Sequence, residues 1–256
     1  MSICKTFIII PARLASTRLP NKLLLNETGK PLIQYAYESA RGSKLAAGVL
    51  IACDDSRIFE AVEAFGGTPI MTDPNAASGT DRIAEVAQKL EDTEIIVNVQ
   101  GDEPNLSPES IDFLIELLIS HPEAVMATLA TPIHRKEDLD DPACVKVVFD
   151  SRGQALYFSR APIPYPRNWS DDMLVASPPL FYQHLGIYAY RRNYLLSLRQ
   201  KEQTTLEKTE NLEQLRAIQS GDIIMVGVVE DASFGIDTPE DYRRFVESEK
   251  EKKCVL

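Results

Sequence analysis

The chain has 256 residues, of which 44% are hydrophobic and 25% charged, as is typical of a globular protein with a substantial core. Its formal net charge of -11 argues against a nucleic-acid partner, because phosphate backbones are bound by basic surfaces. The four cysteines form no CxxC pair and no zinc-finger spacing, so we interpret them as reduced thiols of a cytoplasmic protein. No apolar run approaches the roughly 18 residues of a membrane span, and residues 7–10 are too short for a signal-peptide core.

Short apolar runs alternate with amphipathic segments in the first half of the chain. Apolar runs predict strands over 6–10, 48–53 and 94–100. Helices are predicted over 31–42, 56–67, 78–92 and 107–122. This βαβα rhythm predicts an α/β fold with a mostly parallel sheet and helices on both faces.

The pattern changes after about residue 130. Residues 144–160 predict a β-hairpin around Ser151-Arg152-Gly153, and a proline-rich stretch follows over 161–179. Further strands are predicted over 183–191 and 222–229, and further helices over 193–200, 206–219 and 238–253. Because no internal repeat or linker is visible, we expect one domain over 1–256, with a β excursion over about 131–190 in an otherwise mostly parallel mixed sheet.

A basic loop follows the first predicted strand. Residues 1–26 contain four basic residues and no acidic one, and Arg13, Arg18 and Lys22 lie within ten residues of each other. The carboxyl edge of an open α/β sheet is where ligands bind, so these cations predict a phosphate or polyphosphate ligand. The alternative is that they only solubilise the surface. Neither a Walker A motif nor a GxGxxG motif is present in the sequence.

Two carboxylates are candidates for a metal site. Asp102 lies in the polar turn QGDEP after the third predicted strand, and Asp237 lies between an apolar strand and a helix capped by Thr238. A carboxylate beside a polyphosphate requires a divalent cation between them, and Mg²⁺ prefers one or two carboxylates with phosphates and waters. The alternatives are an Asx-turn at Asp102 and ordinary helix N-terminal stabilisation at Asp237.

Other polar positions carry weaker signals. Ser78 and Arg82 open a predicted helix, where they could meet a base or an anion or could serve only in capping. His184 precedes an alternating strand, and a single histidine is more often structural than catalytic. Four polar residues at spacings of three and four would line one helix face, which is typical of a solvated surface. They are Glu207, Glu210, Glu213 and Gln214.

Eight segments together resemble the 3-deoxy-manno-octulosonate cytidylyltransferase (CMP-Kdo synthetase) family. In chain order they are IIPARLASTRLPNK, GGTPIMT, SGTDR, VNVQGDEP, ALYFSRAPIP, HLGIYAYR, LEKTENLEQLR and GIDTPEDY. The first segment and QGDEP are similar to sugar cytidylyltransferases in general, whereas HLGIY and ENLEQLR resemble the Kdo branch. The sequence departs from the family pattern at Asn21, where glycine is frequent, and at Asp81, where glutamate is frequent.

The resemblance implies a single Rossmann-like domain of the nucleotide-diphospho-sugar transferase type. It implies that CTP and Kdo react to give CMP-Kdo and pyrophosphate for lipopolysaccharide biosynthesis, with Mg²⁺ as cofactor. It also implies a homodimer, with residues 131–190 contributing to the sugar site and to dimerisation. In this reaction the anomeric hydroxyl attacks the α-phosphorus in line.

The resemblance also assigns roles to individual residues. The CTP-binding set comprises Ala12, Arg13, Arg18, Lys22, Ser78, Arg82 and Gln100. The set that would hold Kdo comprises Gln100, Arg160, His184, Tyr188, Glu213 and Gln214. Asp102 and Asp237 would bind the metal and, with Arg13 and Lys22, form the catalytic group.

Three other functions remain open on the sequence alone. The same chemistry could act on sialic acid or on 8-amino-Kdo, because one changed pocket contact can switch the substrate. A glycosyltransferase of similar fold would use a nucleotide sugar rather than make one. A non-catalytic nucleotide-binding protein is disfavoured by the presence of both Asp102 and Asp237.

Overall fold

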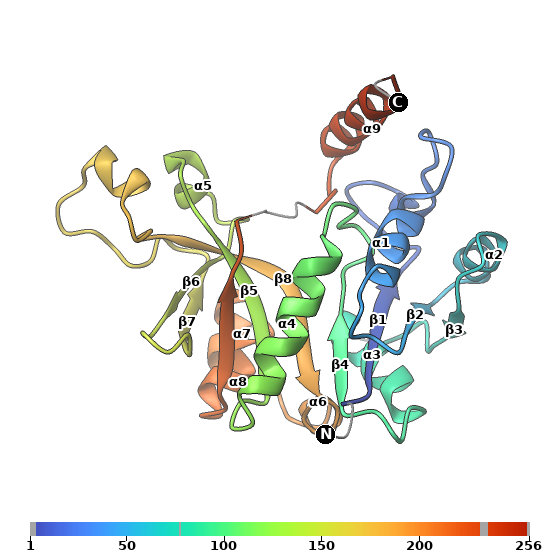
Figure 1. Cartoon of the computed structure of the whole chain (residues 1–256), viewed down its shortest axis with the longest axis horizontal. Coiled ribbons are helices and arrows are strands. Elements are labelled where there is room, and N and C mark those ends of the chain that lie inside the picture. The colour runs from blue at the N-terminus through green and yellow to red at the C-terminus, as the bar shows by residue number, and fades with distance from the viewer. Residues whose placement is uncertain (1–3, 77, 231–234, 255–256) are drawn as a thin grey trace. The chain divides into compact units, whose positions relative to one another are not determined.

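The computed structural model describes residues 4–76, 78–230 and 235–254. The chain divides into two compact units, which are described separately (Figure 1). The first unit comprises Met1–Asp112 and Ser233–Leu256, and the second comprises Phe113–Ala232. In the described part of the chain, no helix is both long enough and apolar enough to cross a bilayer.

The first unit contains four parallel strands in the order β3-β2-β1-β4. They are β1 (Thr6–Ala12), β2 (Gly48–Cys53), β3 (Pro69–Met71) and β4 (Ile95–Asn98). The central strand β1 pairs Ile8 with Val49 on one side and with Val97 on the other. Residues 8–10 are fully buried, which explains why this strand has a continuous rather than alternating apolar sequence.

The helices of the first unit begin at the residues that the sequence predicts or one residue later. They are α1 (Leu32–Arg41), α2 (Ser56–Ala64), α3 (Gly79–Gln88) and α9 (Pro239–Cys254), with a 3₁₀ turn η1 (Lys22–Leu24). Ser78 caps α3 by accepting from the Asp81 amide, and Thr238 caps α9 in the same way. Helix α2 ends three residues earlier than predicted, before Gly66, whose φ of 78° lies in the left-handed region.

The C-terminal helix packs within the first unit. Seven buried side chains form one cluster: Leu19, Leu32, Tyr35, Ile236, Tyr242, Phe245 and Val246. The Tyr35 and Phe245 rings meet edge to face at 4.9 Å, and the Tyr242 hydroxyl accepts from the Glu27 amide at 3.1 Å. Leu19 belongs to the basic loop, so this cluster holds the segment around Asp237 against that loop.

The second unit is a mixed β structure. Its strands are β5 (Met126–Pro132), β6 (Lys146–Phe149), β7 (Ala155–Ser159), β8 (Tyr182–Arg191) and β9 (Ile224–Val228). Strand β5 pairs antiparallel with β8 and parallel with β9, and β6 pairs antiparallel with β7. Its helical segments are α5 (Lys136–Asp140), η2 (Asp171–Val175), α6 (Arg192–Leu198), α7 (Thr205–Glu210) and α8 (Leu215–Gln219), while α4 (Pro108–Ser120) begins in the first unit.

The structure confirms the α/β class and the hairpin over 144–160, in which Gly153 adopts a φ of 84°. The prediction of one helix over 206–219 is wrong, because Asn211 adopts a left-handed φ of 52° and separates α7 from α8. Strands β3 and β5 and helix α5 were not predicted. Within the described residues, Cys4, Cys53 and Cys144 form no disulfide bond, and the Cys254 side chain lies outside the described part. The single-domain organisation remains a prediction.

Candidate active site

The basic loop between β1 and η1 is fixed by backbone contacts within the first unit. The Leu14 amide donates to Asp54 Oδ1 at 2.9 Å, and Asp54 directly follows β2. Asn21 adopts a φ of 53°, which asparagine tolerates better than most residues. This conformation explains why asparagine can stand where related sequences often have glycine. The loop thus enters η1 with Lys22 directed at the carboxylates described next.

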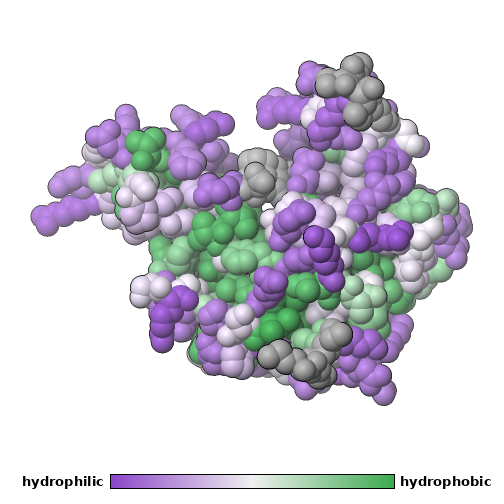
Figure 2. All heavy atoms as spheres, in the orientation of Figure 1, coloured by the Kyte–Doolittle hydropathy of each residue, from purple (hydrophilic) through white to green (hydrophobic). Residues whose placement is uncertain are grey.

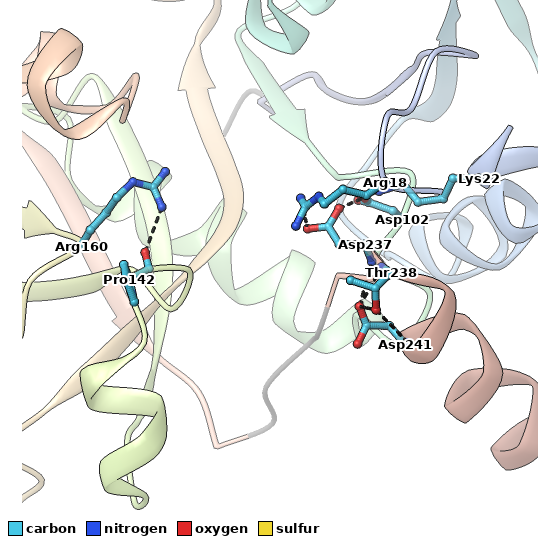
Figure 3. A network of polar contacts seen from close by, with 8 residues as sticks. All are labelled: Arg18, Lys22, Asp102, Pro142, Arg160, Asp237, Thr238 and Asp241. Carbon is cyan, nitrogen blue, oxygen red and sulfur yellow. Dashed lines mark hydrogen bonds and ion pairs between the residues drawn. The ribbon is translucent and has the colours of Figure 1, made fainter. Parts of the chain in front are cut away.

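Asp102 and Asp237 converge on one lysine (Figure 3). Lys22 Nζ donates to Asp102 Oδ2 and, at 3.0 Å, to Asp237 Oδ1. Arg18 Nη2 lies 2.8 Å from the other oxygen of Asp237. The Lys22 side chain is 11% exposed and Arg18 is 62% exposed, so the lysine is the inner cation and the arginine the outer one.

Backbone contacts hold the two aspartates in place. The Ile236 amide donates to the Asp102 carbonyl at 2.9 Å, which connects the two segments directly. Gly101 allows the turn to pack closely, because a Cβ atom there would lie 2.7 Å from Ile33 Cδ1. Asp237 directly precedes the Thr238 cap of α9. In chain order it lies between a strand, β9, which ends at Val228, and helix α9, as the sequence predicts.

The charge state of Lys22 follows from its surroundings. Burial disfavours the ammonium, but the carboxylates of Asp102 and Asp237 outweigh it and raise the pKa of Lys22 above its ordinary value. Lys22 is therefore a cation at neutral pH. Two carboxylates that share one cation also fit a divalent ion whose remaining ligands are phosphate and water. Among the residues that the structure describes, no cluster of three or more His, Cys, Asp or Glu side chains offers a complete metal site.

Arg82 lies in a second cluster of the first unit. Its guanidinium is fully buried, and Nη1 donates to Thr72 Oγ1 at 2.5 Å and to the Asp73 carbonyl at 3.2 Å. Asp54 lies 3.6 Å from Nη2. Burial lowers the pKa of Arg82, an effect that Asp54 opposes and the neighbouring cation Arg13 reinforces.

Buried donor groups remain available in this second cluster. Within the described residues, Arg82 Nε and Arg13 Nη2 are buried without a hydrogen-bond partner. Buried donors are costly to leave unpaired, so these groups are suited to donating hydrogen bonds to the oxygens of a ligand. Ala12 is buried at the end of β1, and Gln100 lies in the turn that carries Asp102. The Ser78 hydroxyl is occupied by the α3 cap, where it also donates to Asp81 at 3.0 Å.

His184 is buried among aromatic side chains of the second unit. It lies on β8, where its Nε2 is 2.9 Å from Thr128 Oγ1 on β5. The Thr128 hydroxyl donates to the Ile187 carbonyl at 2.7 Å, so its oxygen accepts from Nε2–H and Nδ1 keeps its lone pair. The ring meets Phe158 edge-on at 5.0 Å and lies 5.3 Å from Tyr188. Burial lowers the pKa of His184 to about 3, so the imidazole is neutral.

Arg160 joins three segments of the second unit. Its Nε donates to the Glu210 carbonyl at 2.7 Å and its Nη1 to the Pro142 carbonyl at 2.9 Å (Figure 3). The Glu210 carboxylate in turn accepts from the Arg160 amide and, at 2.7 Å, from Ser159 Oγ. Neutral backbone carbonyls therefore set the orientation of the Arg160 guanidinium.

The acidic stripe over α7 and α8 is not a solvated surface, which corrects the sequence-based interpretation. Glu207 is buried and forms a bidentate pair with Arg216, at 2.5 and 2.7 Å. Gln214 is also buried, at the N-terminus of α8, and Glu213 precedes it. The left-handed residue Asn211 lies between Glu210 and Glu213. The four side chains therefore do not share one helix face.

A family model described as cytidylyltransferase matches residues 7–225. The chain belongs to the cytidylyltransferase family. It is 49% identical to a 3-deoxy-manno-octulosonate cytidylyltransferase of Rhodopirellula baltica, over 94% of this chain and 97% of the relative. It is 48% identical to an 8-amino-3,8-dideoxy-manno-octulosonate cytidylyltransferase of Shewanella woodyi, over 92% and 95% of the two chains.

A solved structure supports the same relationship. The structure of a CMP:2-keto-3-deoxy-manno-octonic acid synthetase complexed with CTP is 42% identical to this cytidylyltransferase. It covers 97% of this chain and 99% of its own, with a TM-score of 0.90. The predicted α/β nucleotidyltransferase fold, a mostly parallel mixed sheet flanked by helices, is therefore confirmed.

Several polar residues that contact these candidate residues were not predicted. Asp54 and Thr72 contact Arg82, Thr128 contacts His184, and Glu210 organises Arg160. Asp54 had a usable signal, because it directly follows an apolar strand. Thr128 had none, because it lies within β5, a strand that was not predicted.

Proposed function

We propose that this cytidylyltransferase transfers CMP from CTP to 3-deoxy-D-manno-octulosonate and releases pyrophosphate, as part of lipopolysaccharide biosynthesis in the cytoplasm. The observation that carries the proposal is the 49% identity, over 94% of the chain, to a relative named for this reaction. The site geometry supports it, because one cluster is built for phosphate charge and another for neutral hydrogen bonding.

The first unit offsets the repulsion between two anionic substrates. Two like unit charges about 4 Å apart repel by ~4 kcal/mol at an effective dielectric constant of ~20. Arg13, Arg18 and Lys22 supply positive charge for the triphosphate. As the anomeric oxygen forms its bond to the α-phosphorus, the bond to the bridging oxygen breaks and pyrophosphate leaves with that electron pair. The hydroxyl proton is released to solvent, and positioning and charge stabilisation dominate the catalysis.

We assign Mg²⁺ to Asp102 and Asp237. The carboxylates already share one cation, so their oxygens approach one point closely enough to share a metal ion. When bound, Mg²⁺ would polarise the phosphates and lower the proton affinity of the attacking hydroxyl. The Arg13 and Arg82 donors, with Ala12, Ser78 and Gln100, form the proposed site for the rest of the nucleotide.

The sugar acid is assigned to polar groups of the second unit. Arg160 provides the charge that attracts the carboxylate of the sugar. His184 is neutral and therefore does not pair with that carboxylate, but its Nδ1 can accept from a sugar hydroxyl. Tyr188, Glu213 and Gln214 complete the proposed set of hydroxyl partners, whose pairing gives specificity.

We also propose a homodimer, to which residues 131–190 contribute. Within this segment, Tyr165 and Val175 are 83% and 73% exposed, and Leu180 is 45% exposed. The proline-rich part of the segment carries an apolar patch among hydrophilic residues (Figure 2, upper left). Exposed apolar groups of this kind favour a protein interface.

A second candidate substrate is 8-amino-Kdo, because the relative from Shewanella woodyi is named for it and is nearly as similar. The second substrate has an ammonium in place of one hydroxyl of Kdo. Specific binding of that ammonium requires a hydrogen-bond acceptor, such as a carboxylate, at the same position. The choice between them therefore depends on which side chain faces that position.

The test is pyrophosphate release with CTP, UTP or ATP against Kdo, 8-amino-Kdo and sialic acid, with and without Mg²⁺. We expect turnover with CTP and Kdo only when Mg²⁺ is present. Faster turnover with 8-amino-Kdo than with Kdo would mean that 8-amino-Kdo is the substrate. Binding of CTP without turnover on any acid would favour a nucleotide-binding protein.

A further inference from the structure

We propose that Lys22 is a built-in counter-ion that keeps divalent metal ions out of the Asp102–Asp237 pair until a nucleotide supplies phosphate oxygens for the lysine. The metal would then enter with the nucleotide and not before it. The inference rests on the proposed function only for the identity of that nucleotide.

Shared occupancy is the first argument. The Lys22 ammonium touches one oxygen of each aspartate and so lies where a cation bridging the pair would lie. A metal ion and an ammonium cannot both occupy this position, because both bind through the same oxygens and both are positive. The lysine is nearly buried, so water alone does not replace its two carboxylate partners.

Charge balance is the second argument. In the described structure, two carboxylates face two cations, Lys22 and Arg18, and the four charges sum to zero. A divalent ion added to this group would leave it with a net charge of +2. A metal-bound triphosphate instead brings its own negative charge, so Lys22 and Arg18 can exchange carboxylate for phosphate oxygens. Such an exchange makes metal and nucleotide affinities depend on each other.

The carboxylates are held independently of the lysine. The hydrogen bond from the Ile236 amide to the Asp102 carbonyl and the Thr238 cap of α9 involve no atom of Lys22. The cluster around Tyr242 and Phe245 likewise does not include it. Removing the lysine should therefore leave a preorganised pair of aspartates with an open position between them.

The experiment measures Mn²⁺ binding to the nucleotide-free protein by the loss of the free-ion electron paramagnetic resonance signal. Lys22→Met removes the charge and keeps the length of the side chain, and Lys22→Gln provides a second neutral side chain if the first variant folds poorly. Arg18→Met removes the outer cation, which touches only Asp237. Lys30→Met is the matched control, because it removes a lysine that pairs with Glu38 elsewhere in the same unit.

We expect weak Mn²⁺ binding to the wild type and at least about tenfold tighter binding to Lys22→Met or Lys22→Gln. Arg18→Met should give a smaller gain, and Lys30→Met none. Added Mn²⁺ should also raise the melting temperature of the Lys22 variants more than that of the wild type. Asp102→Asn in the Lys22→Met background should abolish the gain.

Two results would overturn the proposal. Equal Mn²⁺ affinity in the wild type and both Lys22 variants would show that the lysine does not exclude the metal. A gain with Arg18→Met as large as that with Lys22→Met would show a general effect of charge rather than shared occupancy. The Mn²⁺ measurements contain no CTP or Kdo, so a negative result in the pyrophosphate-release assay would not change their interpretation. Equal Mn²⁺ affinities would likewise leave the proposed reaction unaffected.

Discussion

The two polar centres of this protein use different physics. In the first unit, Asp102 and Asp237 are partly exposed and are neutralised by Lys22 and Arg18. In the second unit, His184 is buried, uncharged and hydrogen-bonded to the neutral hydroxyl of Thr128. The first centre is suited to binding charged groups by exchange of ion-pair partners, and the second to recognising the shape and hydroxyl groups of a neutral part of a ligand.

This difference explains where each kind of residue can be placed. Ion pairs tolerate partial exposure because their partners move and exchange, which a phosphate site requires. A neutral histidine in an apolar surrounding keeps one protonation state and one tautomer, which a specific sugar pocket requires. Substitutions in the first unit should therefore affect the reaction rate or the KM for CTP, and substitutions in the second unit the KM for the sugar acid.

The largest effect is expected from Asp102→Asn. The variant removes one carboxylate of the proposed metal pair and keeps the size of the side chain, so kcat should fall by at least about 100-fold. The melting temperature should change little, because the Asp102 backbone contact to Ile236 remains. Asp140→Asn is a control at an exposed carboxylate that pairs with Lys136, and it should retain full activity. Substantial turnover by Asp102→Asn would remove Asp102 from the metal site.

A second variant, His184→Phe, tests the neutral pocket. It keeps an aromatic ring for Phe158 but removes both ring nitrogens and leaves the Thr128 oxygen without its donor. The KM for Kdo should rise about 30-fold while the KM for CTP stays constant, since a lost hydrogen bond in a buried pocket is costly. Steady-state kinetics with each substrate varied in turn provide the measurement. A parallel rise in the KM for CTP would contradict the assignment of His184 to the sugar acid.

The pH dependence of stability gives a third comparison. The folded-state pKa of His184, about 3, lies below its ordinary value of 6.5, so between these values only the unfolded chain takes up the proton. The contribution of the neutral His184 to the free energy of unfolding is therefore complete above pH 6.5. It is lost as the pH falls toward 3, at about 1.4 kcal/mol per pH unit.

Urea unfolding at pH 7, 6 and 5 measures how the free energy of unfolding changes with pH. The comparison is with His184→Phe, which lacks the imidazole. The wild type should lose more stability than the variant as the pH falls, by about threefold in the unfolding equilibrium from pH 7 to 6 and about eightfold from pH 6 to 5. His134→Phe controls for the loss of a histidine, because His134 is exposed and hydrogen-bonds to the Leu174 carbonyl. Equal slopes for the wild type and His184→Phe would show that His184 titrates normally.

Local signals were enough to predict much of the first unit. Strand β1 is a short apolar run, and α3 and α9 begin at capping residues, Ser78 and Thr238, whose role depends on residues three positions away. The cationic loop was also readable from the sequence, because it combines three charges with the end of a strand. These features depend on neighbours in the chain rather than on tertiary contacts.

Non-local contacts account for what the sequence did not reveal. Strand β5 is stabilised by β8 and β9, which lie 50 to 100 residues later in the chain. Glu207 has the sequence pattern of a surface residue, but it is buried in an ion pair with Arg216. That pair forms because the chain changes direction at Asn211, between α7 and α8. Asp237 meets Asp102 because the packing of α9 places it there. Proximity of this kind is set by the fold and leaves no local pattern.

The smallest effect is expected from Arg18→Ala, which sharpens the contrast within the first unit between an inner and an outer cation. Arg18 is largely exposed, so solvent and salt screen its contact with Asp237 and with any bound phosphate. The KM for CTP should therefore rise only about three- to tenfold, and the rise should shrink as the salt concentration increases. Arg135→Ala, at an exposed arginine of the second unit, should leave the KM for CTP unchanged. Unchanged CTP affinity in Arg18→Ala at low salt would mean that only the inner cations of the loop serve the triphosphate.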